Sequence, residues 1–191
     1  NKQYVQKIND KTFISPEPEL ERYLKGSKNF IATTNLKKGL KHSNIVFLFV
    51  STPSLKNGYY DHSQIDRIIN QIIDNGVLEE EKHLIIGCTT MPGYCDTIIK
   101  KLNPYGYIVS YNPEFIAQGS VITDLLNPDI VLIGEGNKLA GIQISEIYSS
   151  ILQNNPSIHL MSLKEAEITK IALNCFLTTK IAYANMIGDI A

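Results

Sequence analysis

Apolar residues along this chain gather in short uninterrupted runs, whereas half-exposed strands would alternate apolar and polar positions. The runs lie at residues 44–50, 83–88, 107–110, 130–134 and, more weakly, 157–161. Strands that are buried on both faces of a parallel sheet have this near-continuous apolar character. The pattern therefore predicts a sheet whose strands run parallel and are covered on both sides.

Segments with helical spacing separate these runs. In two of them, isoleucine and leucine residues recur on one helical face: Ile65, Ile68, Ile69, Ile72 and Ile73 in the first, and Ile142, Ile147, Ile151 and Leu152 in the second. An Asn75-Gly76 pair closes the first helix. Strands and helices that alternate with short connections predict a doubly wound, Rossmann-like α/β fold.

The pattern changes at Ser162, after which one long helix without proline runs to the end of the chain. Ser162 and Glu165 form a capping box at its start. Such a helix after a compact α/β unit is more typical of an inter-domain or dimer-forming element than of one that packs on a sheet. We expect residues 1–161 to belong to the Rossmann-like domain and residues 162–191 to begin a central helical domain.

Composition narrows the class of protein. The 191 residues are 43% hydrophobic and 19% charged, which is ordinary for a soluble domain with its own core. A net charge of -1 gives no basic footprint for nucleic acid. No run approaches the roughly 18 apolar residues of a membrane span. We expect a cytoplasmic protein without nucleic-acid or membrane partners.

The cysteine residues indicate neither a disulfide framework nor a metal site. They are odd in number and contain no C-x-x-C pair, and the four histidines are scattered. We expect Cys88, at the end of a buried strand, and Cys175, facing a helix interior, to be small buried hydrophobic residues. Cys95 has no neighbouring base in the sequence to activate it.

Polar segments follow three of the predicted strands, where ligands bind in open α/β sheets. They are Ser51-Thr52-Pro53-Ser54, Thr89-Thr90-Met91-Pro92-Gly93 and residues 111–119. Each alone has an ordinary interpretation as a turn, with Thr as a helix N-cap before Pro, or Asn-Pro-Glu as a turn start. That interpretation does not explain why all three follow adjacent strands. We therefore expect a site at this edge.

The long helix carries a second candidate group. Lys170 and Asn174 are four residues apart and share a helical face, and Glu167 lies one turn before Lys170. From the spacing alone, an exposed Glu–Lys pair of little energetic value is the simpler interpretation.

In this order, the segments resemble the UDP-glucose and GDP-mannose dehydrogenase family of nucleotide-sugar 6-dehydrogenases. The resemblance rests on the following motifs: residues 1–20 with Asn9 and Pro16-Glu17-Pro18; Val50-Ser51-Thr52-Pro53 with Gly58 and Asp61; Thr89-Thr90-Met91-Pro92-Gly93; Asn112-Pro113-Glu114-Phe115 with Gly119 and Asn127-Pro128-Asp129; and Ala166-Glu167 with Lys170, Asn174, Phe176 and Asn185. Each motif alone is weak, but the series spans essentially the whole chain.

The resemblance implies an enzyme that oxidises the C6 alcohol of a nucleotide sugar to a carboxylate. The reaction uses two hydride transfers to NAD and a cysteine thioester, and UDP-glucose is the favoured substrate. The alcohol must lose a proton and the oxyanion needs a cation or donor. By similarity Lys170 supplies the charge and proton transfer and Asn174 a donor, while Thr90 and Glu114 hold the hydrolytic water.

The resemblance also implies binding residues and a partner. For NAD these are Val50, Ser51, Thr52, Pro53, Ser54, Thr90 and Gln118. For the nucleotide sugar they are Glu114, Phe115, Ile116, Ala117, Gln118, Lys170 and Asn174. No metal is implied, and the long helix suggests a homodimer.

Several features depart from the family pattern. Its glycine-rich loop would precede Asn1 and its nucleophilic cysteine would follow Ala191, so we expect a segment that is inactive alone, with a sheet incomplete at its N-terminus. Gln118, Ile130 and Met186 stand where the family has Glu, Arg and Glu, and Tyr4 where a basic residue often contacts the cofactor ribose. Two alternatives stay open: a GDP-mannose 6-dehydrogenase, or a non-catalytic nucleotide-sugar-binding homologue.

Overall fold

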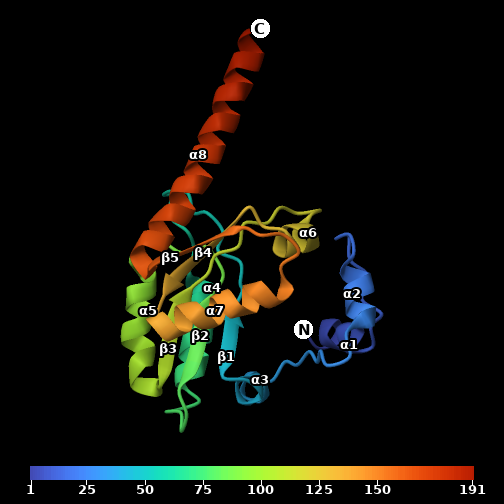
Figure 1. Cartoon of the computed structure of the whole chain (residues 1–191), viewed down its shortest axis with the longest axis vertical. Helices are drawn as coiled ribbons and strands as arrows, with labels where there is room; N and C mark the ends of the chain where they lie inside the picture. The colour runs from blue at the N-terminus through green and yellow to red at the C-terminus, as the bar shows by residue number, and fades with distance from the viewer.

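A five-stranded sheet forms the centre of the computed structural model, which describes residues 1–191 (Figure 1). The strands lie in the order β1 (Ile45–Leu48), β2 (Lys82–Ile86), β3 (Tyr107–Tyr111), β4 (Ile130–Glu135) and β5 (Ser157–Ser162). Each strand coincides with one of the apolar runs to within two residues at either end. The predicted strands are therefore confirmed.

The directions of the strands divide the sheet into two parts. β1, β2 and β3 run parallel to one another, and β4 and β5 form a second parallel pair. β3 and β4 are antiparallel, with Tyr111 opposite Gly134. The sheet is thus mixed, whereas the apolar runs led us to expect parallel strands throughout. An apolar run indicates that a strand is buried on both faces, as β4 is, and it carries no information about the direction of that strand.

Helices cover both faces of the sheet, as a doubly wound fold requires. The helices of the chain are α1 (Lys2–Asn9), α2 (Leu20–Gly26), α3 (Leu36–His42), α4 (Ser63–Ile73), α5 (Tyr94–Leu102), α6 (Val121–Leu126), α7 (Lys138–Ile151) and α8 (Leu163–Ile190), with a 3-10 turn at Asn103–Tyr105. The isoleucine patterns predicted α4 and α7, and both are confirmed. None of the helices combines the length and apolar character needed to cross a membrane.

Two separate hydrophobic clusters lie on the two faces of the sheet. The larger one packs α4, α5 and the start of α8 onto the sheet, with Ile65, Leu84 and Ile98 fully buried within it. The smaller one packs Ile144 of α7 onto Ile85 and other strand residues. Complete burial of one such side chain contributes about 1.5–3 kcal/mol. The larger cluster lies under the segments that carry the polar strand-end residues.

α8 is packed on the domain only through its first part. Ser162 and Glu165 form the predicted capping box. Leu163, Ala166, Glu167 and Lys170 are buried against the domain, whereas every residue beyond Asn174 is exposed and the helix projects from the body (Figure 1). The sequence pattern did not predict the packing of the first part on the sheet. The domain boundary near residue 161 stays a prediction.

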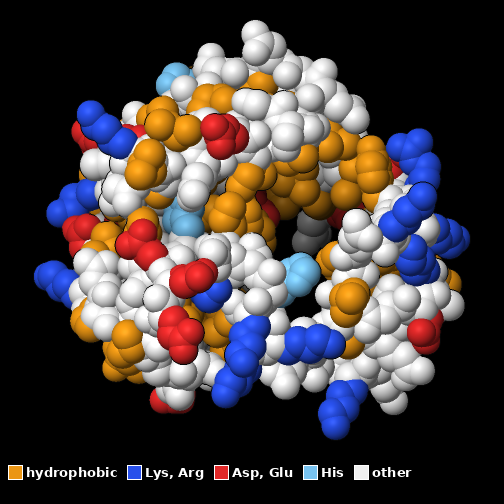
Figure 2. All heavy atoms as spheres, turned by 60° about the horizontal axis from the view of Figure 1, so that its bottom comes forward, with side chains coloured by type: hydrophobic (Ala, Val, Ile, Leu, Met, Phe, Trp, Pro, Cys, Tyr) orange, Lys and Arg blue, Asp and Glu red, His pale blue; other side chains and the backbone are white.

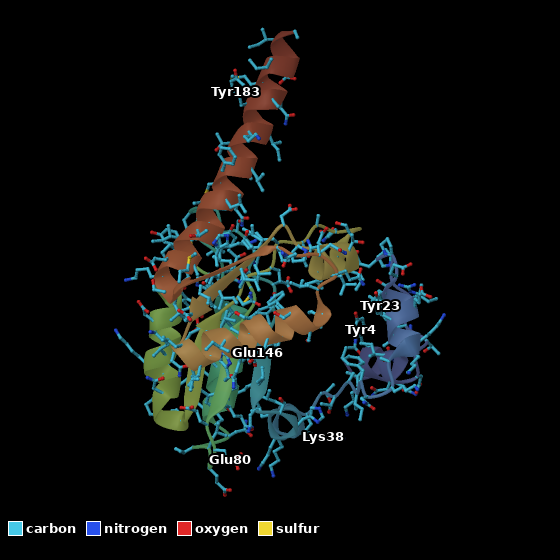
Figure 3. All side chains as sticks on the ribbon, in the orientation of Figure 1. Tyr4, Tyr23, Lys38, Glu80, Glu146 and Tyr183 are labelled. Carbon is cyan, nitrogen blue, oxygen red and sulfur yellow. The ribbon has the colours of Figure 1, made fainter.

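An N-terminal arm, residues 1–35, lies beside the domain and includes α1 and α2 (Figures 1 and 3). Figure 2 shows an opening between the arm and the body, with Lys and Arg side chains gathered on the side of the arm. Glu17 bridges the two parts, because its carboxylate accepts the backbone N–H groups of Gly119 at 2.8 Å and Val121 at 3.4 Å. The arm therefore holds the loop that leads into α6.

Candidate functional site

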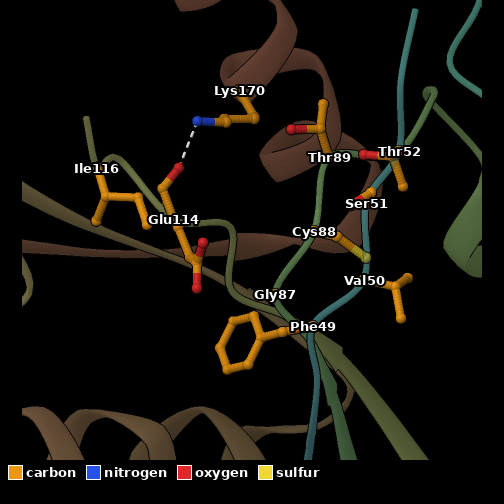
Figure 4. A pocket seen from close by; sticks show the side chains of 10 residues that line it. All are labelled: Phe49, Val50, Ser51, Thr52, Gly87, Cys88, Thr89, Glu114, Ile116 and Lys170. Atoms are coloured by element: carbon orange, nitrogen blue, oxygen red, sulfur yellow. Dashed lines mark hydrogen bonds between the residues drawn. The ribbon is translucent and has the colours of Figure 1, made fainter. Parts of the chain in front are cut away.

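A cavity of about 510 Å³ opens at the carboxyl ends of β1 and β2 (Figure 4). Segments that follow β1, β2 and β3 meet there, together with α8. The lining residues are Phe49, Val50, Ser51, Thr52, Gly87, Cys88, Thr89, Glu114, Ile116 and Lys170. Its volume lies within the range of small-molecule sites, about 300–1,000 Å³.

Backbone hydrogen bonds hold these segments side by side beyond the ends of the strands. The N–H of Gly87 donates to the carbonyl of Leu48 at 3.0 Å, and the N–H of Asn112 donates to the carbonyl of Ile86 at 2.8 Å. The N–H of Glu114 continues the series to the carbonyl of Gly87 at 3.3 Å. The cavity therefore has walls that the sheet itself positions.

Lys170 and Glu114 share this cavity without forming an ion pair. The Lys170 amine donates to the backbone carbonyl of Glu114, and its Nζ lies 4.1 Å from the centroid of the Phe115 ring. Figure 4 shows the Glu114 carboxylate turned away from the amine, toward Phe49. The cavity thus presents a cation and a carboxyl group on different sides.

Burial has the largest influence on the pKa values of both Glu114 and Lys170. It raises the pKa of Glu114 and lowers the pKa of Lys170, and in each case the charge of the other residue acts in the opposite direction. The pKa values of the two groups are therefore brought toward one another. Groups whose pKa values move toward the working pH are suited to accept and return protons.

Of the two adjacent threonines after β2, the one that lines the cavity is Thr89. Thr90 is 0% exposed, and its Oγ1 donates to Glu167 at 2.8 Å. Thr90 does not cap α5, whose N-cap is Gly93. Sequence reasoning selected Thr90 and missed Thr89; the catalytic and NAD-binding roles of Thr90 stay predictions.

Glu167 and Lys170 do not form the exposed pair that their spacing suggested. Glu167 is 0% exposed and Lys170 is 7% exposed. The Glu167 carboxylate accepts from Thr90 and from the start of α5. That interpretation was wrong, because both side chains point into the domain and each contacts a different loop.

The other predicted site residues divide into two groups. Val50, Ser51, Thr52 and Ile116 line the cavity with Glu114 and Lys170. Pro53, Ser54, Phe115, Ala117, Gln118 and Asn174 do not line it. Among these, Ala117 donates its backbone N–H to Asp124 at 2.9 Å, Gln118 is exposed and Asn174 is half-buried on α8.

Asn112 has a structural contact that the turn interpretation did not predict. This side chain is 2% exposed; its Nδ2 donates to the Leu132 carbonyl at 2.9 Å and its Oδ1 accepts from the Tyr148 hydroxyl at 2.8 Å. Asn112 therefore ties the segment that carries Glu114 to β4 and α7.

The positions that depart from the family pattern lie in different places. Ile130 lines a small space of about 20 Å³ that Glu114 also borders. Met186 is exposed on the projecting part of α8. Tyr4 is exposed on the arm and packs edge-on against Phe13, with the ring centroids 4.8 Å apart. Of these positions, only Ile130 adjoins the candidate site.

The cysteines differ in exposure. Cys88 is buried as expected, whereas Cys175 is exposed, so the expectation of burial was wrong for Cys175. Cys95, whose burial the sequence did not predict, is buried too. It lies in the part of α8 that packs against nothing in the chain. Burial raises the pKa of Cys88 and raises that of Cys95 well above its usual value, which keeps both thiols protonated.

Comparison with known proteins gives consistent matches. Residues 1–152 match the model of the UDP-glucose/GDP-mannose dehydrogenase family, NAD binding domain. The UDP-glucose 6-dehydrogenase of Rickettsia felis is 29% identical over 191 residues, covering 97% of this chain and 42% of that protein. The GDP-mannose 6-dehydrogenase of Pseudomonas aeruginosa is 29% identical over 187 residues, covering 92% of this chain and 42% of that protein.

A solved structure agrees with these matches. The crystal structure of a ternary complex of GDP-mannose dehydrogenase from Pseudomonas aeruginosa superposes with a TM-score of 0.90 and 27% identity. The superposition covers 100% of this chain and 46% of that one. The chain therefore spans less than half the length of each of these three relatives.

Proposed function

Because the chain belongs to the UDP-glucose/GDP-mannose dehydrogenase family and its residues 1–152 match the NAD-binding domain, we propose that it is part of an enzyme that oxidises a nucleotide sugar at C6. UDP-glucose is the proposed substrate and UDP-glucuronate the product, in line with the named activity of relatives such as the Rickettsia felis protein. The observation that carries the proposal is the meeting of Lys170 and Glu114 in one cavity with strand-end hydroxyl groups.

The cavity suits the cofactor of this family, NAD. The hydroxyls of Ser51, Thr52 and Thr89 offer donors and acceptors to the amide and the ribose of NAD, and Gly87 leaves room for the Phe49 ring that lines the same cavity. When bound, NAD accepts the hydride that leaves the sugar carbon. The protein contributes the cavity walls, which hold the nicotinamide ring of NAD against the substrate and exclude water.

Lys170 is proposed to act on the sugar oxygen. As a neutral amine it accepts the proton of the C6 alcohol, and as a cation it stabilises the negative charge that develops on this oxygen. Its partial burial supports both roles, because burial lowers its pKa and strengthens its electrostatic interactions. The contact of the amine with the Glu114 carbonyl holds it at the cavity.

Glu114 is proposed to hold the water that hydrolyses the thioester and to transfer its proton. The ionised carboxylate can take up a proton from the attacking water, and the carboxylic acid so formed can give this proton to the leaving thiolate; a raised pKa suits the group to both steps. Neither Cys88 nor Cys95 is proposed as the thioester cysteine, because burial raises the pKa of both thiols. Cys175 is exposed on α8 and does not line the cavity, so we do not expect these 191 residues alone to turn over substrate.

The test is the stoichiometry of NADH formed per UDP-glucose consumed by the product of the complete gene. About two equivalents support the double oxidation, and about one would point to an enzyme that stops at the aldehyde. Activity with GDP-mannose in place of UDP-glucose would establish the alternative substrate, which the Pseudomonas aeruginosa match also favours. If neither sugar gives NADH but one of them binds in a titration, the protein is a non-catalytic nucleotide-sugar-binding homologue.

A homodimer in the cytoplasm completes the proposal. The projecting part of α8 exposes the apolar side chains of Phe176, Leu177, Ile181, Tyr183, Met186, Ile187 and Ile190 (Figure 3 labels Tyr183). An apolar helix surface of this kind is stabilised when a second copy covers it. Light scattering of the complete gene product should give a dimer, and a monomer at every concentration would reject this assembly.

A further inference from the structure

Glu167 is a buried carboxylate that no cation neutralises. It is 0% exposed, and none of the four ion pairs in the structure includes it. Its oxygens accept hydrogen bonds from the Thr90 hydroxyl at 2.8 Å and from the backbone N–H groups of Gly93 at 2.6 Å and Cys95 at 2.9 Å. A buried charge is tolerated only where donors satisfy it in this way.

These contacts make Glu167 the cap of a helix other than its own. The first N–H groups of a helix have no partner within it, and the N-cap residue of α5 is Gly93, which has no side chain to supply one. The carboxylate of Glu167 supplies the acceptor from across the interface and meets the positive end of the α5 dipole. The position of α8 is thereby tied to the turn that follows β2.

The same contacts determine where Lys170 lies. Residues three apart on a helix are neighbours on one face, so a fixed Glu167 also fixes the rotation of α8 at Lys170. From there the amine reaches the Glu114 carbonyl and the face of the Phe115 ring. A helix rotated about its axis would carry the amine out of the cavity into solvent.

We propose that Glu167 is a positioning residue, which anchors α8 to the turn 90–95 and so holds the Lys170 amine inside the cavity. Glu167 itself touches no reacting group. The inference rests on the proposed function only for the catalytic meaning of Lys170. The anchoring can be measured without turnover.

The experiment measures the acetylation rate of Lys170 by an N-hydroxysuccinimide ester of acetate, using peptide mass spectrometry on the complete gene product. Lys164, exposed on the same helix, is the internal reference. Glu167→Gln removes the charge and turns an N–H toward a donor, so the ratio of the Lys170 rate to the Lys164 rate should rise roughly fivefold, the factor that one lost hydrogen bond produces. An unchanged ratio in folded Glu167→Gln would overturn the proposal.

Glu165→Gln is the matched control. Glu165 lies two residues away on the same helix and is exposed, and its carboxylate hydrogen-bonds only to Ser162, so this variant should leave the ratio unchanged. If circular dichroism finds Glu167→Gln unfolded, Glu167→Asp is measured instead. That variant keeps the charge but shortens the reach, and a rise in the ratio supports the anchor while an unchanged ratio refutes it.

Turnover separates this inference from the proposed function. In an active enzyme, Glu167→Gln should lower kcat and leave KM for the nucleotide sugar nearly unchanged, with Glu167→Asp recovering part of the rate. A wild-type protein that forms no NADH would refute the proposed function and leave the acetylation result standing. An unchanged acetylation ratio would refute the anchor and leave the function standing.

Discussion

The ring of Phe49 lies where a side chain on Gly87 would stand. A Cβ built on Gly87 would lie 1.8 Å from Cε1 of Phe49, so only glycine leaves room for the ring. The two residues follow adjacent strands, β1 and β2, and both line the cavity (Figure 4). Sequence reasoning selected neither residue, because the contact depends on the register of the two strands.

Gly87→Ala should therefore weaken NAD binding with little loss of stability. The ring is 51% exposed and can move aside, so the cost in free energy of unfolding should be at most about 1 kcal/mol, at the low end for overpacking. A displaced ring changes the cavity wall, and we expect Kd for NAD to rise roughly tenfold, about 1.4 kcal/mol. Fluorescence titration of the complete gene product measures this.

Phe49→Ala combined with Gly87→Ala provides the control for that prediction. Removal of the ring should restore much of the affinity, because the three atoms nearest to the new methyl group all belong to that ring. If Gly87→Ala binds NAD as tightly as the wild type, or if the double variant is no better than the single one, the ring and the glycine do not shape the cofactor site together.

Gly134→Ala should weaken the packing of α8 on the sheet. A Cβ there would lie 2.9 Å from the Cα of Leu163 and 3.1 Å from the Cβ of Ala166, and the backbone of α8 cannot swing away as a side chain can. We expect a loss of about 1–3 kcal/mol in the free energy of unfolding, measured with urea. Gly39→Ala in α3, which has no neighbour within 4 Å, should instead gain up to about 1 kcal/mol. Equal effects of the two substitutions would contradict this account.

Lys170→Ala in the complete gene product should lower turnover far more than it lowers binding of the nucleotide sugar. The amine matters most when the oxyanion forms, and positioned acid–base groups contribute roughly 10²–10⁴-fold to rate. Steady-state kinetics and a binding titration measure the two effects. Lys164→Ala is the matched control, because Lys164 is an exposed partner of Asp96 at 3.6 Å. Losses of equal size in turnover and binding would refute the proposed role of Lys170.

Stability should fall as the pH drops below about 6.5, the ordinary pKa of histidine. Burial lowers the pKa of His62 and His83 in the folded protein, so between the folded and unfolded pKa values the unfolded chain binds more protons. The free energy of unfolding therefore rises with pH across this window and declines as the pH falls through it. Urea unfolding at pH 7.5, 6.5 and 5.5 measures the slope.

Substitution of single histidines tests the origin of that slope. His62 Nε2 accepts from the Met91 N–H at 3.3 Å, which only the unprotonated nitrogen can do. His62→Gln should reduce the slope, whereas His159→Gln, at an exposed position, should leave it unchanged. A wild-type slope of zero between pH 5.5 and 7.5 would show that neither His62 nor His83 resists protonation.

The sequence predicted those features that depend on periodicity and on neighbours along the chain. The strands, α4, α7 and the capping box of Ser162 all belong to this class. The antiparallel direction of β4 does not belong to this class, because the segment Ile130–Glu135 has the same apolar character whichever way the strand runs.

Features that depend on distant contacts could not be predicted in the same way. Glu167 is buried because the turn 90–95, more than 70 residues earlier, offers it three donors. The choice between Thr89 and Thr90 as the cavity residue depends on the direction in which the chain leaves β2. The motifs identified the segments of the site, and packing determined which side chain of each segment faces the cavity.

The exposed end of α8 lies much farther from the buried Glu167 than Lys170 does. Each helical residue adds about 1.5 Å, so Ile190 lies about 35 Å from Glu167 and Lys170 only about 4.5 Å. If α8 pivots at Glu167, a sideways movement of about 8 Å at Ile190 displaces the helix axis at Lys170 by about 1 Å. The Lys170 amine lies on the short side of this pivot. A thermal movement of the exposed end of the helix, or a force applied there, therefore displaces Lys170 in the cavity far less than it displaces Ile190.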